Sequence, residues 1–190
     1  MKNYILTLFL FTITLSFAQK KDCLLDFEEK TDSTYIKKTA DILIHERVFG
    51  NSKEMVFFSL LNSDGVPMLG LQQIQKSKDF IPALCFDKNS KIIFQLENGK
   101  IISLINSNQE NCSSFSYDVE TKSNIKVITS YFLFLKDNYE ELKKSPISLM
   151  RIKFVGESRD IVLKSNLDSE LLKTKSSPSN YFVDYLNCVE

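Results

Sequence analysis

The chain has 190 residues, of which 43% are hydrophobic, and its 24 basic residues balance its 24 acidic ones. A hydrophobic fraction of this size is typical of a globular domain and excludes a mainly disordered chain. The balanced charge, without a long basic run, argues against nucleic acid and anionic membranes as partners, because both require a concentrated cationic surface.

The N-terminal segment has the order of a secretory signal peptide. Lys2 precedes an apolar run over residues 4–15, and small residues follow at Ser16 and Ala18. The run is too short to span a hydrocarbon core of about 30 Å. We therefore expect residues 1–18 to be a signal peptide and residues 19–190 to form a single globular domain, exported to the periplasm or the exterior, with no transmembrane helix in the mature chain.

From Cys23 to about Val155, apolar and polar residues alternate, and turn residues recur at short intervals. This spacing is typical of antiparallel β-sheets. The predicted strands are Tyr35–Ile44, Glu54–Leu61, Pro67–Gln73, Ile81–Phe86, Lys91–Glu97, Lys100–Ile105, Lys126–Leu135 and Ile147–Val155.

Two helices follow from local signals. Asp137 and Glu140 have the spacing of a capping box, and the helix that they open must end before Pro146. A second helix begins at Pro178 and carries an apolar stripe, and a further helical turn is predicted at Leu167–Leu172. The expected fold is α+β: a mainly antiparallel β-sheet, as a meander or sandwich, with a short helix before the last long strand and a C-terminal helix packed on or beside the sheet.

Residues 85–112 predict a β-hairpin with a cysteine at each end. Asn98-Gly99 is the preferred pair for a two-residue type I′ loop. Glu97 then opposes Lys100, and the numbers of opposed residues sum to 197. One face carries Ile92, Phe94 and Leu96, and the other carries Ile93, Ile102 and Leu104, so the hairpin is expected to be a core element. Cys85 and Cys112 also sum to 197. We expect the ladder to break near residues 87–90, so that these cysteines meet at the base of the hairpin without being direct cross-strand partners.

The mature chain has four cysteines, and an even number in an exported protein indicates disulfides, for which four cysteines allow three pairings. The hairpin favours Cys85–Cys112, which leaves Cys23–Cys188. A redox or metal site is disfavoured, because C-x-x-C motifs and closely spaced ligand pairs are absent from the sequence. We expect no cofactor.

Three groups of residues are candidates for catalysis, and none of them predicts it. His45 is the single histidine, but on a strand Glu46 points to the opposite face, and Arg47 on the same face disfavours the imidazolium. Glu28-Glu29 and Glu140-Glu141 are carboxylates adjacent in sequence, whereas a glycosidase pair must face across a cleft. There is also no G-x-S-x-G elbow and no Gly-rich phosphate loop.

Two further stretches admit a structural and a functional interpretation. Tyr131–Leu135 is strongly apolar, which fits a core strand better than a ligand cavity. Asn111-Cys112-Ser113 matches a glycosylation sequon, but its cysteine is expected in a disulfide.

Several landmarks resemble those of small, uncharacterised secreted bacterial proteins that are rich in β-strands. They are "TDSTYIKKT" after an N-terminal cysteine, "KIIFQLENGKIISL", "YEELKKSPISLMRIKF" and the closing "YFVDYLNCVE". The resemblance implies an architecture and no activity. The sequence thus predicts a non-enzymatic exported module that binds a protein, glycan or lipid, and the alternative is a secreted hydrolase whose site assembles only in the fold.

Overall fold

The computed structural model describes residues 22–107, 110–135 and 138–190. The strands of its main sheet are β1 Leu25–Lys30, β2 Tyr35–Thr39, β3 Ile42–Phe49, β4 Ser52–Ser63, β5 Val66–Ser77, β7 Lys91–Leu96, β8 Ile101–Asn106, β10 Ser114–Asp118, β11 Ser123–Leu133, β12 Ile147–Lys153 and β13 Ser158–Val162. Two short pairs lie outside it, β6 (Cys85–Phe86) with β9 (Asn111–Cys112) and β14 (Leu167–Asp168) with β15 (Lys175–Ser176). The helical segments are α1 Tyr139–Leu142, η1 Pro178–Asn180, α2 Tyr181–Tyr185 and η2 Leu186–Val189.

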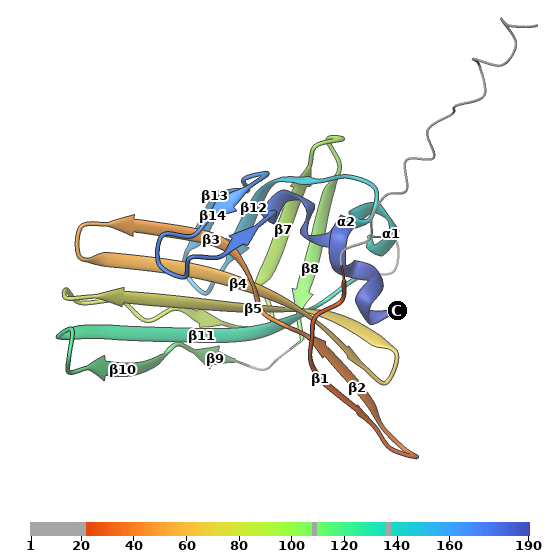
Figure 1. Cartoon of the computed structure of the whole chain (residues 1–190), viewed down its shortest axis with the longest axis horizontal. Helices are drawn as coiled ribbons and strands as arrows, with labels where there is room; N and C mark the ends of the chain where they lie inside the picture. Colours follow the sequence, from red (N-terminus) through yellow and green to blue (C-terminus); the bar gives the residue numbers. More distant parts are fainter. Residues whose placement is uncertain (1–21, 108–109, 136–137) are drawn as a thin grey trace, which may run out of the picture.

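The main sheet is antiparallel, in the order β1-β2-β4-β5-β11-β8-β7-β12-β13. In addition, β3 pairs with one half of β4, and β10 pairs with one half of β11. The longest strands change partners along their length. β4 pairs with β3 over Ser52–Phe58 and with β2 over Leu61–Ser63. As a result the sheet bends over itself, and β7, β8 and β12 cross the group formed by β3, β4, β5 and β11 (Figure 1).

The core lies where these two groups of strands meet the C-terminal helix. Phe58 of β4 has no exposed surface, and its ring lies 6.1 Å from Phe94 of β7 and 5.3 Å from Tyr181 of α2, centroid to centroid. Phe182 is buried beside them. The prediction of an α+β fold with a C-terminal helix on the sheet is therefore confirmed, although the helix consists of three short pieces rather than one.

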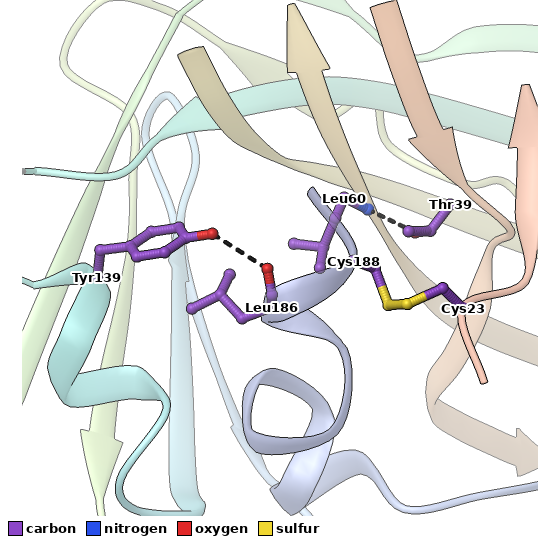
Figure 2. Close-up of a disulfide and its surroundings, with 6 residues drawn as sticks. All are labelled: Cys23, Thr39, Leu60, Tyr139, Leu186 and Cys188. Atoms are coloured by element: carbon purple, nitrogen blue, oxygen red, sulfur yellow. Dashed lines mark hydrogen bonds between the residues drawn. A yellow bond between two sulfur atoms is a disulfide. The ribbon is translucent and has the colours of Figure 1, made fainter. Parts of the chain in front are cut away.

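The C-terminal segment is tied to the rest of the molecule by a disulfide and a hydrogen bond (Figure 2). Cys188, 2% exposed, is bonded to Cys23, and their Cα atoms are 5.5 Å apart. The Tyr139 hydroxyl, at the start of α1, donates a hydrogen bond to the Leu186 carbonyl (3.1 Å). The second disulfide joins Cys85 to Cys112, so both bonds are the pairs that the sequence favoured.

The hairpin register predicted around Asn98-Gly99 is wrong by one residue. Gln95 pairs with Ile101, and Leu96 N–H donates to the Lys100 carbonyl (2.9 Å), so that the loop has three residues. Of the Asn-Gly pair only Gly99 has a positive φ, of 84°, as expected for a type I turn followed by a glycine bulge. A slip of one residue moves side chains to the opposite face, so Ile102 and Leu104 share the buried face with Phe94 and not the opposite one.

Cys85 and Cys112 are nevertheless direct cross-strand partners, in the separate β6–β9 pair. The expectation that they would not be opposed is therefore wrong, although the ladder does break between β6 and β7. Asp87 forms the turn there, because its carboxylate accepts hydrogen bonds from Asn89 N–H (2.9 Å) and the Ser90 hydroxyl (3.0 Å). Opposed residue numbers sum to 197 in the β6–β9 pair and to 196 in the β7–β8 pair, and this turn accommodates the difference of one residue.

Other boundaries also differ from prediction. The strand expected over Tyr35–Ile44 is two strands, separated where the Ala40 N–H donates to Leu24 instead of the sheet. The strand expected over Ile81–Phe86 is only β6, and Pro82 has no N–H for a ladder. The helical turn expected at Leu167–Leu172 is the β14–β15 ribbon with its turn. Asp137 lies outside the described residues, and Asn138 precedes α1 without a side-chain cap.

Besides the short strands β9, β14 and β15, three strands of the main sheet were not predicted: β1, β10 and β13. All three lie at edges of the sheet, where one side of the strand lacks a neighbour. β10 does alternate, as Ser-Phe-Ser-Tyr, but it is only five residues long and its aromatic side chains are exposed, so no buried face identifies it as a strand.

Candidate functional site

A cleft opens at the end of the sheet where β3 turns into β4. We call it the open-end cleft; its volume is about 540 Å³, and it is lined by Arg47–Phe49, Ser52–Glu54, Gln75–Ser77 and Asp79–Pro82. A second hollow of about 420 Å³ adjoins it, shares Arg47, Glu54 and Gln75, and extends to His45 and to Arg159–Ile161 of β13. Both volumes are within the range of small-ligand sites.

The alternation of the strands places a polar row at this end of the inner face. Arg47 of β3 is paired with Glu54 of β4, which is paired with Gln75 of β5. Val56 and Phe58, further along β4 on the same face, are fully buried in the core. The inner surface therefore changes from apolar to charged toward the cleft.

Glu54 is the centre of the charged row and is only 7% exposed. Its Oε1 accepts hydrogen bonds from Gln73 Nε2 (2.8 Å) and Arg159 Nη1 (3.2 Å), and its Oε2 accepts one from Arg47 Nη2 (3.0 Å). A buried carboxylate needs such partners, because burial without them is costly. Since both oxygens are occupied, Glu54 acts as an anchor for the two arginines rather than as a free base.

The two arginines differ in exposure. The Arg159 side chain is 25% exposed, and its guanidinium also contacts Glu157 (2.8 Å). The Arg47 side chain is 67% exposed and contacts Glu54 through one nitrogen. A guanidinium has five N–H donors, so Arg47 is held in place by Glu54 and still offers donors to a ligand in the cleft.

The rim of the cleft is aromatic. Phe49, where β3 ends, is 81% exposed, and Phe80, in the segment after β5, is 86% exposed. The segment that carries Phe80 is fixed at its start, because Asp79 N–H donates to Ser77 Oγ (3.1 Å) and Asn124 Nδ2 donates to the Asp79 carbonyl (3.0 Å). Two large apolar rings thus border a cavity that has a cationic wall.

His45 lines the adjoining hollow, half-buried, on the same side as Arg47. Burial lowers the pKa of His45; the Glu54 carboxylate opposes this shift and Arg47 adds to it. Within the described residues the imidazole has no hydrogen-bond partner. Burial thus favours the neutral form of an imidazole that lies beside the charged row without an acid that orients it.

Glu46 points away from His45, as expected for its neighbour on a strand. Its carboxylate accepts hydrogen bonds from the Ser169 hydroxyl (2.5 Å) and the Glu170 N–H (2.8 Å), next to the β14–β15 ribbon. It holds that ribbon against the edge of β3 and does not form a dyad with His45.

The other sequence candidates lie outside the cleft. Glu28 accepts a hydrogen bond from the Tyr35 hydroxyl, and Glu140 and Glu141 contact lysines at the surface. Phe132 is fully buried in β11, in agreement with the core interpretation of its segment. The Asn111 amide donates to the Thr129 carbonyl (2.7 Å), so the sequon asparagine is engaged in the fold.

The four cysteines, which are disulfide-bonded, are not among the residues that line either hollow. In the part of the chain that the structure describes, no three His, Cys, Asp or Glu side chains are grouped to hold a metal ion, and no helix has the length and apolar character needed to cross a membrane.

The sequence reasoning missed Arg47, Glu54, Gln73 and Arg159 as a site. The sequence did contain one signal: Glu54 and Gln73 are polar residues at positions of their strands that alternate with the exposed face and otherwise hold apolar core residues. The partner Arg159 follows Glu54 by 105 residues, and no local pattern connects them.

Comparison of the chain with protein-family models, with curated proteins and with solved structures finds no significant match. The function must therefore be argued from the cleft itself.

Proposed function

We propose that the protein is an exported, non-enzymatic binding module whose ligand occupies the open-end cleft. The observation that carries this proposal is the combination of a cavity of about 540 Å³ with two highly exposed phenylalanines and an anchored, accessible arginine. The signal-like N-terminus and the two disulfides support export.

The lining indicates the chemistry of the ligand. Phe49 and Phe80 provide apolar surface, which favours an aliphatic or aromatic body. Arg47 offers N–H donors and a positive charge, which favour a carboxylate or another acidic group. Because Glu54 already neutralises part of the local positive charge, a single acidic group suits the site better than a polyanion. We infer a ligand of lipid character that has one acidic head group.

The test is an NMR titration of the isotopically labelled mature protein with dodecanoate, compared with dodecyltrimethylammonium, which has the same tail and a cationic head. Dodecanoate is expected to shift the amide signals of β3, of β4 and of residues 79–82. The Phe80→Ser and Arg47→Gln variants should each weaken binding by roughly tenfold, the factor that corresponds to about 1.4 kcal/mol.

The matched control is Ile101→Ser, which removes an apolar side chain that is 70% exposed on β8, outside the cleft. This variant should bind dodecanoate like the wild type. The proposal fails if dodecanoate shifts no cleft amides, if the cationic amphiphile binds equally well, or if the control loses as much affinity as Phe80→Ser.

A further inference from the structure

One sheet edge is open to pairing, and it belongs to β10. The strand pairs with β11 in a regular register from Ser114↔Val127 to Asp118↔Ser123, and among the described strands none pairs with its other side. The neighbouring β6 segment covers the chain only up to Ser113, whose N–H donates to the Leu84 carbonyl (2.7 Å). Residues 114–117 are all exposed.

The edges at β1, β13 and β3 carry features that prevent pairing, and the part of β8 that does not pair with β11 is approached by Asn138, whose amide donates to the Ser103 carbonyl (3.2 Å). β1 is interrupted by a bulge and ends in three charged residues, Glu28–Lys30. β13 carries Arg159 and Asp160, both in ion pairs. β3 is covered by the β14–β15 ribbon, because the Ser176 hydroxyl donates to the Leu43 carbonyl (2.6 Å). Bulges, charges and covering segments are the usual means of blocking an edge strand.

β10 has none of these features. Its sequence is Ser-Phe-Ser-Tyr-Asp, without lysine, proline or a bulge, and its single charge, Asp118, is at the end of the strand and is bound to Lys76 (2.6 Å). Phe115 and Tyr117 are 61% and 52% exposed. The strand therefore presents an aromatic pair beside an unblocked backbone edge.

We propose that β10 pairs with β10 of a second copy of this chain, antiparallel and about a two-fold axis at Ser116. In this register Phe115 opposes the partner's Tyr117, and the symmetry repeats the contact, which gives two aromatic cross-strand pairs. Ser114 opposes the partner's Asp118, so that a hydroxyl lies beside each carboxylate. The interface is self-complementary without an unpaired charge.

Other registers lose these contacts. An axis at Asp118 places the two carboxylates opposite each other, which is unfavourable. An axis at Ser114 places Phe115 opposite the partner's Ser113 and leaves Tyr117 without an aromatic partner. The full chain has a formal net charge of zero, and removal of residues 1–18 takes away only Lys2, so little long-range repulsion opposes association of two mature copies. Because the edge is short, the dimer is expected to be weak, with dissociation in the micromolar to millimolar range.

The test is sedimentation equilibrium of the mature protein over a concentration series, with hydrogen exchange of its amides measured at the lowest and highest concentrations. The mass is expected to rise toward that of a dimer. Protection should increase with concentration in residues 114–118 and stay unchanged in β1 and β13. The exchange measurement uses the unaltered chain, so it does not depend on the folding of a variant.

Ser116→Lys places two lysines at the two-fold axis and is expected to leave the protein monomeric, whereas Ser158→Lys, the matched change at the exposed start of β13, should leave the dimer intact. A protein that stays monomeric at every concentration overturns the proposal. So does a dimer that survives Ser116→Lys, is lost in Ser158→Lys, or protects an edge other than β10. None of these results bears on the open-end cleft, because Ser116 does not line it.

Discussion

Replacing Glu54 by glutamine removes one charge from the centre of the cleft wall while keeping the shape of the side chain. The carboxylate is 7% exposed and accepts hydrogen bonds from Gln73, Arg47 and Arg159. The neutral amide of Glu54→Gln can accept fewer of these bonds and balances neither guanidinium. The perturbation therefore leaves Arg47 without its carboxylate partner and leaves Arg159 with Glu157 as its remaining one.

The size of the effect follows from the exposure of the two arginines. Removing one partner of a fully buried ion pair costs about 3–5 kcal/mol. Arg159, 25% exposed, keeps its contact with Glu157 and so bears only part of that penalty, whereas Arg47, 67% exposed, turns to solvent at little cost. We expect Glu54→Gln to lower the free energy of unfolding by about 2–3 kcal/mol, which is below the range for a fully buried pair because both arginines are partly exposed.

Urea denaturation of the mature protein at neutral pH measures this loss, and Asp160→Asn is the matched control. Asp160 forms two contacts of 2.6 Å with Arg151, but both side chains are about half exposed, so its loss should cost less than about 1 kcal/mol. The reasoning is refuted if Glu54→Gln is no less stable than wild type, or if Asp160→Asn costs as much.

Two further predictions concern pH and the disulfides. Because burial lowers the pKa of His45 from 6.5, the unfolded chain takes up a proton first on acidification. The wild type should therefore lose stability relative to His45→Gln as the pH falls below 6.5; a constant difference in urea unfolding above and below that pH would contradict this. The Cys23–Cys188 bond joins residues separated by 165 positions and the Cys85–Cys112 bond residues separated by 27, so replacing the first pair by alanine should cost about 5 kcal/mol and the second about 3.5 kcal/mol. The reverse order in denaturant would be inconsistent with the chain-entropy argument.

The hairpin around Gly99 shows how far local signals lead. The glycine marked the turn, and alternation placed both strands, but the choice between a loop of two and a loop of three residues depends on which register buries more. Only the observed register brings Phe94 opposite Ile102 and Ile92 opposite Leu104, all buried. With either loop length five apolar side chains of the two strands share the face of Ile92, so counting them in the sequence does not separate the two registers.

The candidate site was much harder to predict than the fold. Glu54, Gln73 and Arg159 lie on β4, β5 and β13. Their side chains are in contact because the sheet bends and brings β13, at one end of the strand order, beside β4 and β5. Phe49 is the last residue of β3 and Phe80 lies in the segment after β5, and both are exposed, so no periodic pattern assigns them a position in space. Local chemistry thus does not distinguish them from ordinary surface residues.

The sequence by itself determined the elements that depend on neighbours in the chain: the alternation of the central strands, the turn at Gly99, the C-terminal helix after Pro178, and the set of cysteines available for pairing. Only the tertiary structure decided the register of the hairpin, the division of β2 from β3, and the meeting of Arg47, Glu54 and Arg159. The physical reason is that turn and helix preferences arise from backbone sterics and local hydrogen bonds. Registers and ion pairs instead depend on burial between segments far apart in the chain.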